Sequence, residues 1–243
     1  MSDGPPIESS ITPLIATLNI GGRIFCRALT RVTVVGAIDE IPREGPLIIA
    51  ANHASNLDAV VLGSWIVPKL GRRINWLGKK ELFDWPVLGY LAAHVGVHPV
   101  DRGAADVEAF RVARRILDQG HILFVFPEGT RSADGALQAA HDGAAVLAQR
   151  TGAPIVPIGI AGSHRVWPRG QALPHPGGRV TLRVGSPFRP GEELPPGTDR
   201  RSGKALITMM IMERIAALLP PSQRGVYGNP VAEASRTPAS PER

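Results

Sequence analysis

The sequence predicts an α/β fold: a single domain with a mostly parallel central sheet flanked by helices, preceded by an N-terminal amphipathic helical segment. Two observations support this prediction. Short β-branched or aromatic runs bounded by glycine or proline are typical of buried strands, and here they alternate with segments of helical period. Strands that alternate with helices form a parallel sheet, whose ligands bind beyond the carboxyl ends of the strands.

Three runs have the composition of buried strands: residues 46–51, 121–126 and 154–158. Residues 180–184 instead alternate strictly between apolar and polar side chains. Alternation of this kind is typical of a strand with one exposed face. We therefore expect the strand at residues 180–184 to lie near an edge of the sheet.

Helical periodicity marks residues 104–119, 138–151 and 202–219. In the first of these segments, apolar residues recur on one face opposite Arg111 and Arg115. Each segment is followed by a glycine or a proline, which are the usual residues after a helix end. We expect these helices to flank the sheet.

The N-terminal segment, residues 9–32, carries two stripes at helical spacing. The apolar stripe is Ile11, Leu14, Ile15, Leu18, Phe25, Leu29 and Val32, and the cationic stripe is Arg23, Arg27 and Arg31. We expect Gly21-Gly22 to divide the segment into two helical pieces. An amphipathic segment of this kind suits a membrane interface, with its arginines on anionic head groups. The alternative is a helix that only packs on the sheet.

The two ends of the chain lack periodicity. We expect residues 1–8 to be a flexible N-terminus, residues 33–220 to form the folded domain, and residues 221–243 to be a disordered tail.

Composition limits the classes of protein that fit. The 243 residues include 27 lysines and arginines against 21 acidic residues, a net charge of +6, which favours phosphate, nucleic acid or lipid head groups as partners.

Cys26 is the one cysteine, which excludes an internal disulfide. The longest stretch without charged residues, 85–100, is too short to span a membrane. No signal-peptide pattern opens the chain, so a cytoplasmic location is expected. His94 and His98 lack a third ligand, so no metal site is expected.

The first strand run is followed by residues 52–58, with the sequence NHASNLD. If Ser55 or Asn56 caps a helix, His53 lies in the loop and Asp58 in the first turn, within reach of the imidazole. An aspartate that holds one ring nitrogen leaves the other free to remove a proton from a hydroxyl. The spacing also fits a capping box from Ser55 to Asp58 beside a packed histidine, and both interpretations stay open.

The second strand run ends in residues 126–132, with the sequence FPEGTRS. This break brings together backbone N–H groups, the Arg131 guanidinium and the hydroxyls of Thr130 and Ser132, which suits a phosphate. The alternative is an ordinary turn with Arg131 in a surface ion pair. Arg102 ends a third apolar stretch, and it would share this edge of the sheet if the strands are parallel.

Residues 52–58, 96–102, 126–132 and 154–158 resemble, in order and spacing, the four motifs of the PlsC-type glycerolipid acyltransferases, which include 1-acylglycerol-3-phosphate acyltransferases. The resemblance covers roughly residues 30–220, so that residues 33–220 would be the acyltransferase domain. It implies an enzyme that moves a fatty acyl group from acyl-CoA or acyl-carrier protein to the hydroxyl of a lysophosphatidic acid-like acceptor. The product would be phosphatidic acid, for phospholipid biosynthesis, and no cofactor beyond the acyl donor is implied.

The resemblance also implies roles for single residues. His53 would be the general base, oriented by Asp58. The residues implied in binding the acceptor phosphate and shaping the site are Arg102, Glu128, Gly129, Thr130 and Arg131, and Pro157 is implied on the acyl-donor side. Loop N–H groups beside the His–Asp pair are candidates to stabilise the oxyanion. The implied partners are a lysophospholipid, the acyl donor and an anionic membrane, with the protein peripheral on the inner face of the cell membrane.

One departure from the family pattern affects the head-group site. Many members have Phe-Lys-x-Gly where this chain has Ala140-His141-Asp142-Gly143. A fixed cation is therefore lost at this point or made dependent on pH.

Other functions stay open beside this one. The acceptor could be another lysophospholipid or a glycolipid, and a thioesterase or lipase is weakened by the missing Gly-x-Ser-x-Gly elbow. A basic module without catalysis would bind nucleic acid or a membrane through interleaved cations and aromatics. These residues are Lys69, Arg72, Arg73, Lys79 and Lys80 with Trp65, Trp76, Phe83 and Trp85. The acyltransferase motifs favour the membrane, and a nucleic acid partner is not expected.

Overall fold

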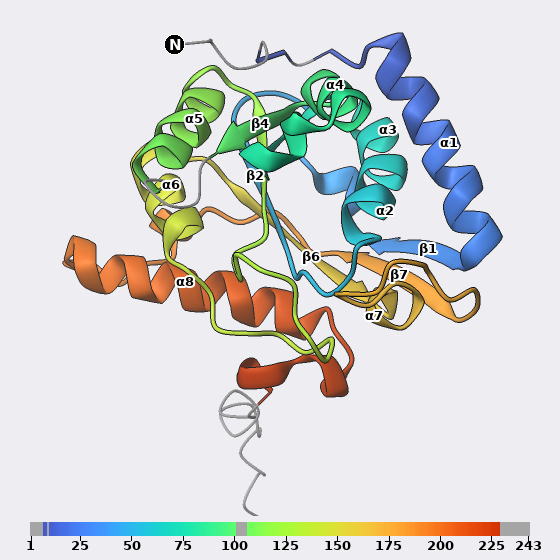
Figure 1. Ribbon diagram of the computed structural model, residues 1–243. Helices are drawn as coiled ribbons and strands as arrows, with labels where there is room; N and C mark the ends of the chain where they lie inside the picture. Colours follow the sequence, from blue (N-terminus) through green and yellow to red (C-terminus); the bar gives the residue numbers. More distant parts are fainter. Residues whose placement is uncertain (1–6, 9, 101–105, 229–243) are drawn as a thin grey trace, which may run out of the picture.

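A seven-stranded sheet with helices on both faces forms the centre of the described part of the chain (Figure 1). The structure is a computed structural model that describes residues 7–8, 10–100 and 106–228. The strands are β1 (Arg31–Gly36), β2 (Leu47–Ala51), β3 (Ile74–Lys79), β4 (Val97–Val100), β5 (Ile122–Val125), β6 (Ile155–Ala161) and β7 (Arg179–Val184). This architecture confirms the predicted α/β fold.

The order of the strands is β1-β7-β6-β2-β5-β3-β4. The five strands from β6 to β4 are parallel, and Ala50 of β2 pairs with Val125 on one side and Pro157 on the other. Their carboxyl ends therefore meet at one edge of the sheet. Strand β7 runs antiparallel to β6 and pairs in parallel with the edge strand β1. Its buried and more exposed side chains alternate, as predicted for residues 180–184.

The helices of eight residues or more are α1 (Pro13–Leu29), α2 (Asp58–Trp65), α4 (Pro86–His94), α5 (Asp106–Asp118), α6 (Gly143–Thr151) and α8 (Arg200–Ala217). The shorter helical turns are α3 (Val67–Leu70), α7 (Ser163–Val166), η1 (Ile38–Glu40), η2 (Lys80–Asp84), η3 (Pro190–Glu192), η4 (Pro221–Gln223) and η5 (Gly225–Tyr227). Helices α5, α6 and α8 correspond to the three helices predicted from periodicity. None of the described helices has the length and apolar composition to cross a bilayer.

Helix α6 is shorter than predicted, because residues 138–142 are not helical. Their backbone N–H groups have tertiary partners instead of helical carbonyls. The N–H of Gln138 donates to the Glu128 carboxylate, and that of His141 donates to the carbonyl of Pro127. These bonds tie the segment to the loop that follows β5.

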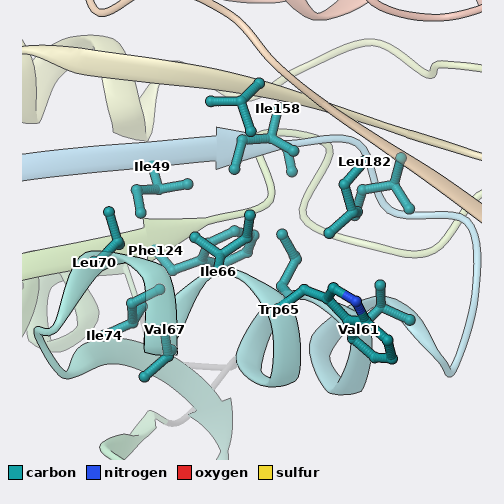
Figure 2. Packing of buried hydrophobic residues seen from close by; sticks show 14 of the residues in the cluster. Ile49, Val61, Trp65, Ile66, Val67, Leu70, Ile74, Phe124, Ile158 and Leu182 are labelled. Carbon is teal, nitrogen blue, oxygen red and sulfur yellow. The ribbon is translucent and has the colours of Figure 1, made fainter. Parts of the chain in front are cut away.

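The side chains of β2 show how the sheet is covered on both faces. Leu47 and Ile49 belong to a cluster that includes Trp65 of α2, and Figure 2 shows Ile49 in this packing. Ile48 and Ala50 belong to a second cluster, which includes residues of α5, α6 and α8. Every side chain of β2 is buried, which explains why this strand has a continuous apolar sequence.

Helix α1 is one continuous helix, so the predicted break at Gly21-Gly22 is wrong. A Cβ on Gly22 would lie 2.2 Å from Ser64 Oγ, whereas nothing lies within 4 Å of a Cβ on Gly21. Gly22 thus allows α1 to approach α2 closely, and α1 lies alongside α2 in Figure 1. Residues 31–32, predicted to end the helical segment, belong to β1.

Part of the apolar stripe predicted to enter a membrane packs against the protein, whereas Phe25 of the stripe is exposed. Ile15 is buried, and Ile11 and Leu29 contact the core cluster around α2. The Arg23 side chain also faces the protein, since its Nε donates to the Ser64 carbonyl at 2.7 Å. For these residues the structure supports the alternative, a helix that packs on the fold.

Residues 221–228, predicted to belong to the disordered tail, form η4 and η5. The buried Gln223 side chain fastens them to the domain. It accepts from the Gly162 N–H and donates to the Gly135 carbonyl, both at 3.1 Å. This correction extends the folded domain to residue 228.

Candidate active site

His53 and Asp58 meet at the carboxyl end of β2. His53 lies in the loop after the strand, and Asp58 is the first residue of α2. His53 Nδ1 is 2.9 Å from Asp58 Oδ2. The Asp58 side chain is fully buried, whereas that of His53 is 20% exposed. The two residues therefore make the contact that a His–Asp dyad requires, and the histidine is open to a substrate. We call residues 52–58 the dyad loop.

Asp58 also holds the dyad loop in shape. Its Oδ2 accepts the N–H groups of Ala54 and Ser55, both at 2.8 Å. Ser55 Oγ accepts from the Leu57 N–H and donates to the carbonyl of Trp167. Half of the capping box therefore forms, and one carboxylate oxygen both closes the turn and faces the imidazole. The two interpretations of this motif are compatible.

Glu128 joins the loops that follow β2 and β5. Its Oε1 accepts the His53 backbone N–H at 2.8 Å, and its Oε2 accepts the Gln138 N–H at 2.9 Å. The His53 carbonyl in turn accepts from the Ser132 N–H at 2.7 Å. Glu128 is only 2% exposed. The resemblance implies Glu128 in binding the acceptor phosphate and shaping the site, and the structure shows it as a buried clamp on the backbone of His53.

Burial raises the pKa of Glu128 to about 7, from an ordinary value of 4.5. Its two backbone hydrogen bonds lower the pKa, and the charges of Asp58 and Asp134 raise it. The clamp therefore titrates near neutral pH, so the geometry around His53 is linked to pH.

The loop after β5 also fixes the ring of His53. This ring stacks on Phe126, with ring centroids 3.8 Å apart and planes inclined by 10°. Gly129 has a φ of +67°, and a Cβ there would lie 2.8 Å from His141 Cδ2. Both the backbone conformation and the space therefore require glycine, and His141 lies against residues 126–132, which we call the phosphate loop after their predicted role.

Thr130 and Arg131 are partly exposed in the same loop. Among the described residues, none forms an ion pair or hydrogen bond with the Arg131 guanidinium, and the Arg131 carbonyl accepts from Arg169. Strand β4 ends at the same edge of the sheet as β2 and β5, but Arg102 lies outside the described residues. Pro157 is buried within β6, and its implied role stays a prediction.

The N–H groups of the dyad loop are already in use. The N–H of His53 donates to the Glu128 carboxylate, and those of Ala54 and Ser55 donate to the Asp58 carboxylate. The N–H of Asn56 donates to the Trp167 carbonyl, and that of Leu57 donates to the Ser55 hydroxyl. Each of these five N–H groups therefore has an acceptor within the protein. Stabilisation of an oxyanion by loop N–H groups beside the His–Asp pair stays a prediction.

Two cavities lie beside Phe126, one on each face of the sheet. The first, about 660 Å³, lies between the strand ends and helices α5 and α6, and its ionisable lining residues are His141, Asp142 and Lys204. The second, about 500 Å³, lies between β3 and helices α1 and α2, and its lining is apolar apart from Asn19, Ser64 and Arg73. The phosphate loop contributes Gly129 to the first cavity.

Lys204 of α8 was not singled out in the sequence. Its Nζ is 2.8 Å from Asp142 Oδ2, next to the first cavity. No local sequence pattern marks this lysine, because its partner Asp142 is distant in the chain. The one related observation in the sequence is that residues 141–142 depart from the Phe-Lys-x-Gly pattern.

The cations and aromatics considered as a nucleic-acid surface are dispersed in the structure. Trp65 and Arg73 are buried, and Trp76 packs against the core. Arg72 donates to the carbonyls of two separate loops. Of the aromatic residues in this set, Trp85 alone is exposed, and Phe83 is half-buried. No group of three His, Cys, Asp or Glu suited to a metal occurs between residues 7 and 228 where the chain is described.

A family model described as Acyltransferase matches residues 31–161, which is more than half of the chain. A chloroplastic 1-acyl-sn-glycerol-3-phosphate acyltransferase of Brassica napus is 33% identical over 141 residues, which are 57% of this chain and 40% of that protein. The 1-acyl-sn-glycerol-3-phosphate acyltransferase of Bacillus subtilis (strain 168) is 30% identical over 124 residues, 51% of this chain and 60% of that protein. This chain thus spans less than two thirds of either relative.

A solved structure shares the fold. It is the 1-acyl-sn-glycerophosphate (LPA) acyltransferase PlsC from Thermotoga maritima, with a TM-score of 0.68 and 24% sequence identity. The match covers 84% of this chain and 79% of that chain. It extends the likeness in fold beyond the residues matched by the family model.

Proposed function

The chain belongs to the acyltransferase family, and from this premise we propose that it transfers a fatty acyl group from acyl-CoA or acyl-carrier protein to the free hydroxyl of lysophosphatidic acid. The names of the Brassica and Bacillus relatives support this acceptor. The observation that carries the proposal is the 2.9 Å contact of His53 with the buried Asp58, at the edge where the parallel strands end.

In the proposed reaction Asp58 holds His53 Nδ1 as the N–H donor, which leaves Nε2 to accept a proton. The acceptor hydroxyl gives its proton to Nε2 while its oxygen forms a bond to the thioester carbonyl carbon. The tetrahedral intermediate then breaks its C–S bond, and the leaving thiolate takes the proton back from the imidazolium. The products are phosphatidic acid and a free thiol, and His53 is restored.

Thr130 and Arg131 are proposed to hold the acceptor phosphate. Their loop is tied to the dyad loop through the Ser132 N–H and the His53 carbonyl. A guanidinium binds phosphate through two parallel hydrogen bonds, which a lysine does not reproduce. Arg102 is proposed to join them, because its segment follows β4 at the same edge of the sheet.

A thiol-release assay tests the proposed reaction. Wild-type protein is expected to release thiol from acyl-CoA when lysophosphatidic acid is present, and mass spectrometry should identify phosphatidic acid. A panel of other lysophospholipids, glycerol 3-phosphate and glycolipids tests the alternative acceptors. His53→Ala should lower turnover by at least about 10²-fold with an unchanged melting temperature.

The matched control is His175→Ala, which alters an exposed histidine in the loop before β7. It should turn over like wild type. Thiol release that needs no acceptor would indicate a hydrolase, and wild-type turnover in His53→Ala would remove the general base from the proposal.

We also propose that the protein reaches its lipid substrate by peripheral binding to an anionic membrane through η2 and α4. Four apolar or aromatic side chains are exposed there: Trp85, Val87, Leu88 and Tyr90, with Trp85 at 66% and Val87 at 71%. Tryptophan and tyrosine are favoured at the level of lipid head groups. The exposed Lys79 and Lys80 precede them in the chain and would meet anionic lipids.

The second cavity is proposed to receive the acyl chain. Leu82 of η2 and Leu18 of α1 line it, and so does Phe126, which stacks on His53. An acyl chain taken from a bilayer would therefore find an apolar space between the exposed surface and the dyad.

Vesicle sedimentation tests the membrane proposal. Wild-type protein should pellet with vesicles rich in phosphatidylglycerol and less with neutral phosphatidylcholine. Trp85→Ser with Leu88→Ser should weaken binding about a hundredfold or more, because two apolar side chains are lost whose burial stabilises binding by about 1.5–3 kcal/mol each. Leu173→Ser removes an even more exposed apolar side chain from a different loop and should bind like wild type. Equal pelleting of the double variant and wild type would contradict this surface.

A further inference from the structure

The first cavity has an apolar lining and a charged rim. Its lining residues are apolar or glycine apart from His141, Asp142 and Lys204. The fixed cation among the lining residues is Lys204, which reaches the rim from α8. A cavity of this composition fits an amphiphile, with a hydrocarbon chain inside and an anionic head group at the rim.

Lys204 is held in place by Asp142. Lys204 Nζ is 2.8 Å from Asp142 Oδ2, and Thr208 Oγ1 donates to Asp142 Oδ1 at 2.8 Å. Both carboxylate oxygens are therefore engaged by α8, where Lys204 and Thr208 are one turn apart. The Lys204 contact, followed by the Thr208 hydroxyl, lowers the pKa of Asp142 and so maintains its charge.

The ammonium group keeps donors for a ligand. A lysine has three N–H donors, and the Asp142 carboxylate engages one of them in this ion pair. The Lys204 side chain is 37% exposed beside the cavity. Gly129, in the loop proposed to hold the acceptor phosphate, lines the same cavity. Lys204 and the phosphate loop therefore border one space, although α8 is remote from that loop in the sequence.

We propose that Lys204 binds the phosphate of the acceptor and supplies the cation that the Phe-Lys-x-Gly motif has lost at residues 141–142. Asp142 is then a positioning residue for Lys204. This inference rests on the proposed function and adds a residue that determines head-group specificity. The cation would then lie on α8 and not at the motif position that precedes α6.

Kinetics with two acceptors test this inference. Lys204→Met keeps the length of the side chain and removes its charge. It should raise the KM for lysophosphatidic acid about tenfold, the loss expected for one charge-assisted hydrogen bond. The kcat, the KM for acyl-CoA and the KM for monoacylglycerol, which lacks the phosphate, should stay near wild type. Lys204→Arg should retain most of the affinity.

Arg201→Ala is the matched control, since it removes a cation from the same helix that does not line the cavity. The melting temperature of each variant is measured to check that the variant is folded. Calorimetric titration with lysophosphatidic acid measures the same loss of affinity without turnover.

The outcomes separate this inference from the proposed reaction. If Lys204→Met leaves both the KM and the calorimetric affinity for lysophosphatidic acid unchanged, Lys204 only forms a surface ion pair with Asp142, and the inference is overturned. A rise confined to the KM for acyl-CoA would overturn the acceptor assignment. A wild-type protein that acylates no acceptor would instead refute the proposed function, while the calorimetric comparison would still decide the role of Lys204.

Discussion

The dyad loop and helix α1 are held in place by different interactions. In the dyad loop, each backbone N–H from residue 53 to residue 57 has an acceptor, and Asp58 Oδ2 accepts two of them beside the imidazole. Helix α1 is held mainly by packing, with Gly22 against Ser64 and Ile15 in the core. The loop should therefore be sensitive to single polar atoms, whereas the helix should be sensitive to volume.

The largest effect is expected at Asp58, where one polar atom serves both the loop and the dyad. Asp58→Asn should lower kcat about 10³- to 10⁴-fold, because an amide no longer holds the required tautomer of His53. The measurement is thiol release together with the melting temperature. A loss below tenfold would show that Asp58 serves the turn alone.

The second effect concerns Glu128, the clamp on the dyad loop. Its pKa is about 7 in the folded protein against an ordinary 4.5, so the folded state retains a proton that the unfolded state releases between these values. The contribution of protonated Glu128 to the free energy of unfolding is then fully present below pH 4.5. This contribution decreases as the pH rises toward 7, by at most about 1.4 kcal/mol per pH unit.

Urea unfolding of wild type and Glu128→Gln between pH 4 and pH 8 measures this contribution. The free energy of unfolding of wild type minus that of Glu128→Gln should decrease across this window. Glu192→Gln changes an exposed glutamate of η3 and should keep the wild-type slope. A difference between wild type and Glu128→Gln that is independent of pH would contradict the raised pKa.

A smaller effect is expected from added volume in α1. Gly22→Ala should destabilise the protein by about 1–2 kcal/mol, because the new Cβ meets Ser64 Oγ at 2.2 Å. Thermal unfolding measures the loss. Ser64→Ala in the same chain should recover part of it, since the clashing hydroxyl is removed. Equal stability of Gly22→Ala and wild type would show that α1 and α2 adjust freely.

The smallest effect is expected at the neighbouring glycine. A Cβ on Gly21 meets nothing within 4 Å, and alanine is the better helix former. Gly21→Ala should therefore stabilise the protein by about 0.5–1 kcal/mol, measured in the same thermal unfolding. Destabilisation at both glycines would indicate that α1 requires flexibility and not only a close approach to α2.

Local interactions explain which features were predictable. His53 and Asp58 are five residues apart, and the turn between them is closed by the Asp58 carboxylate itself, so their spacing already determines their contact. The strands at residues 46–51 and 121–126 were predictable because a strand buried on both faces has a continuous apolar sequence. Periodicity likewise predicted helix α1 without indicating its surroundings.

The tertiary structure decided which groups face each other across the fold. An apolar stripe fits a membrane or a protein core equally well, and only the position of α2 brings Ile15 of α1 into the core. Lys204 reaches Asp142 because α8 packs against α6. The sequence by itself thus determined the buried strands β2, β5 and β6, the helices α5 and α8, and the short distance between His53 and Asp58, because burial and periodicity are written in each segment. The clamp at Glu128 and the charged rim at Lys204 depend on contacts between distant segments, which only the assembled sheet and its helices bring together.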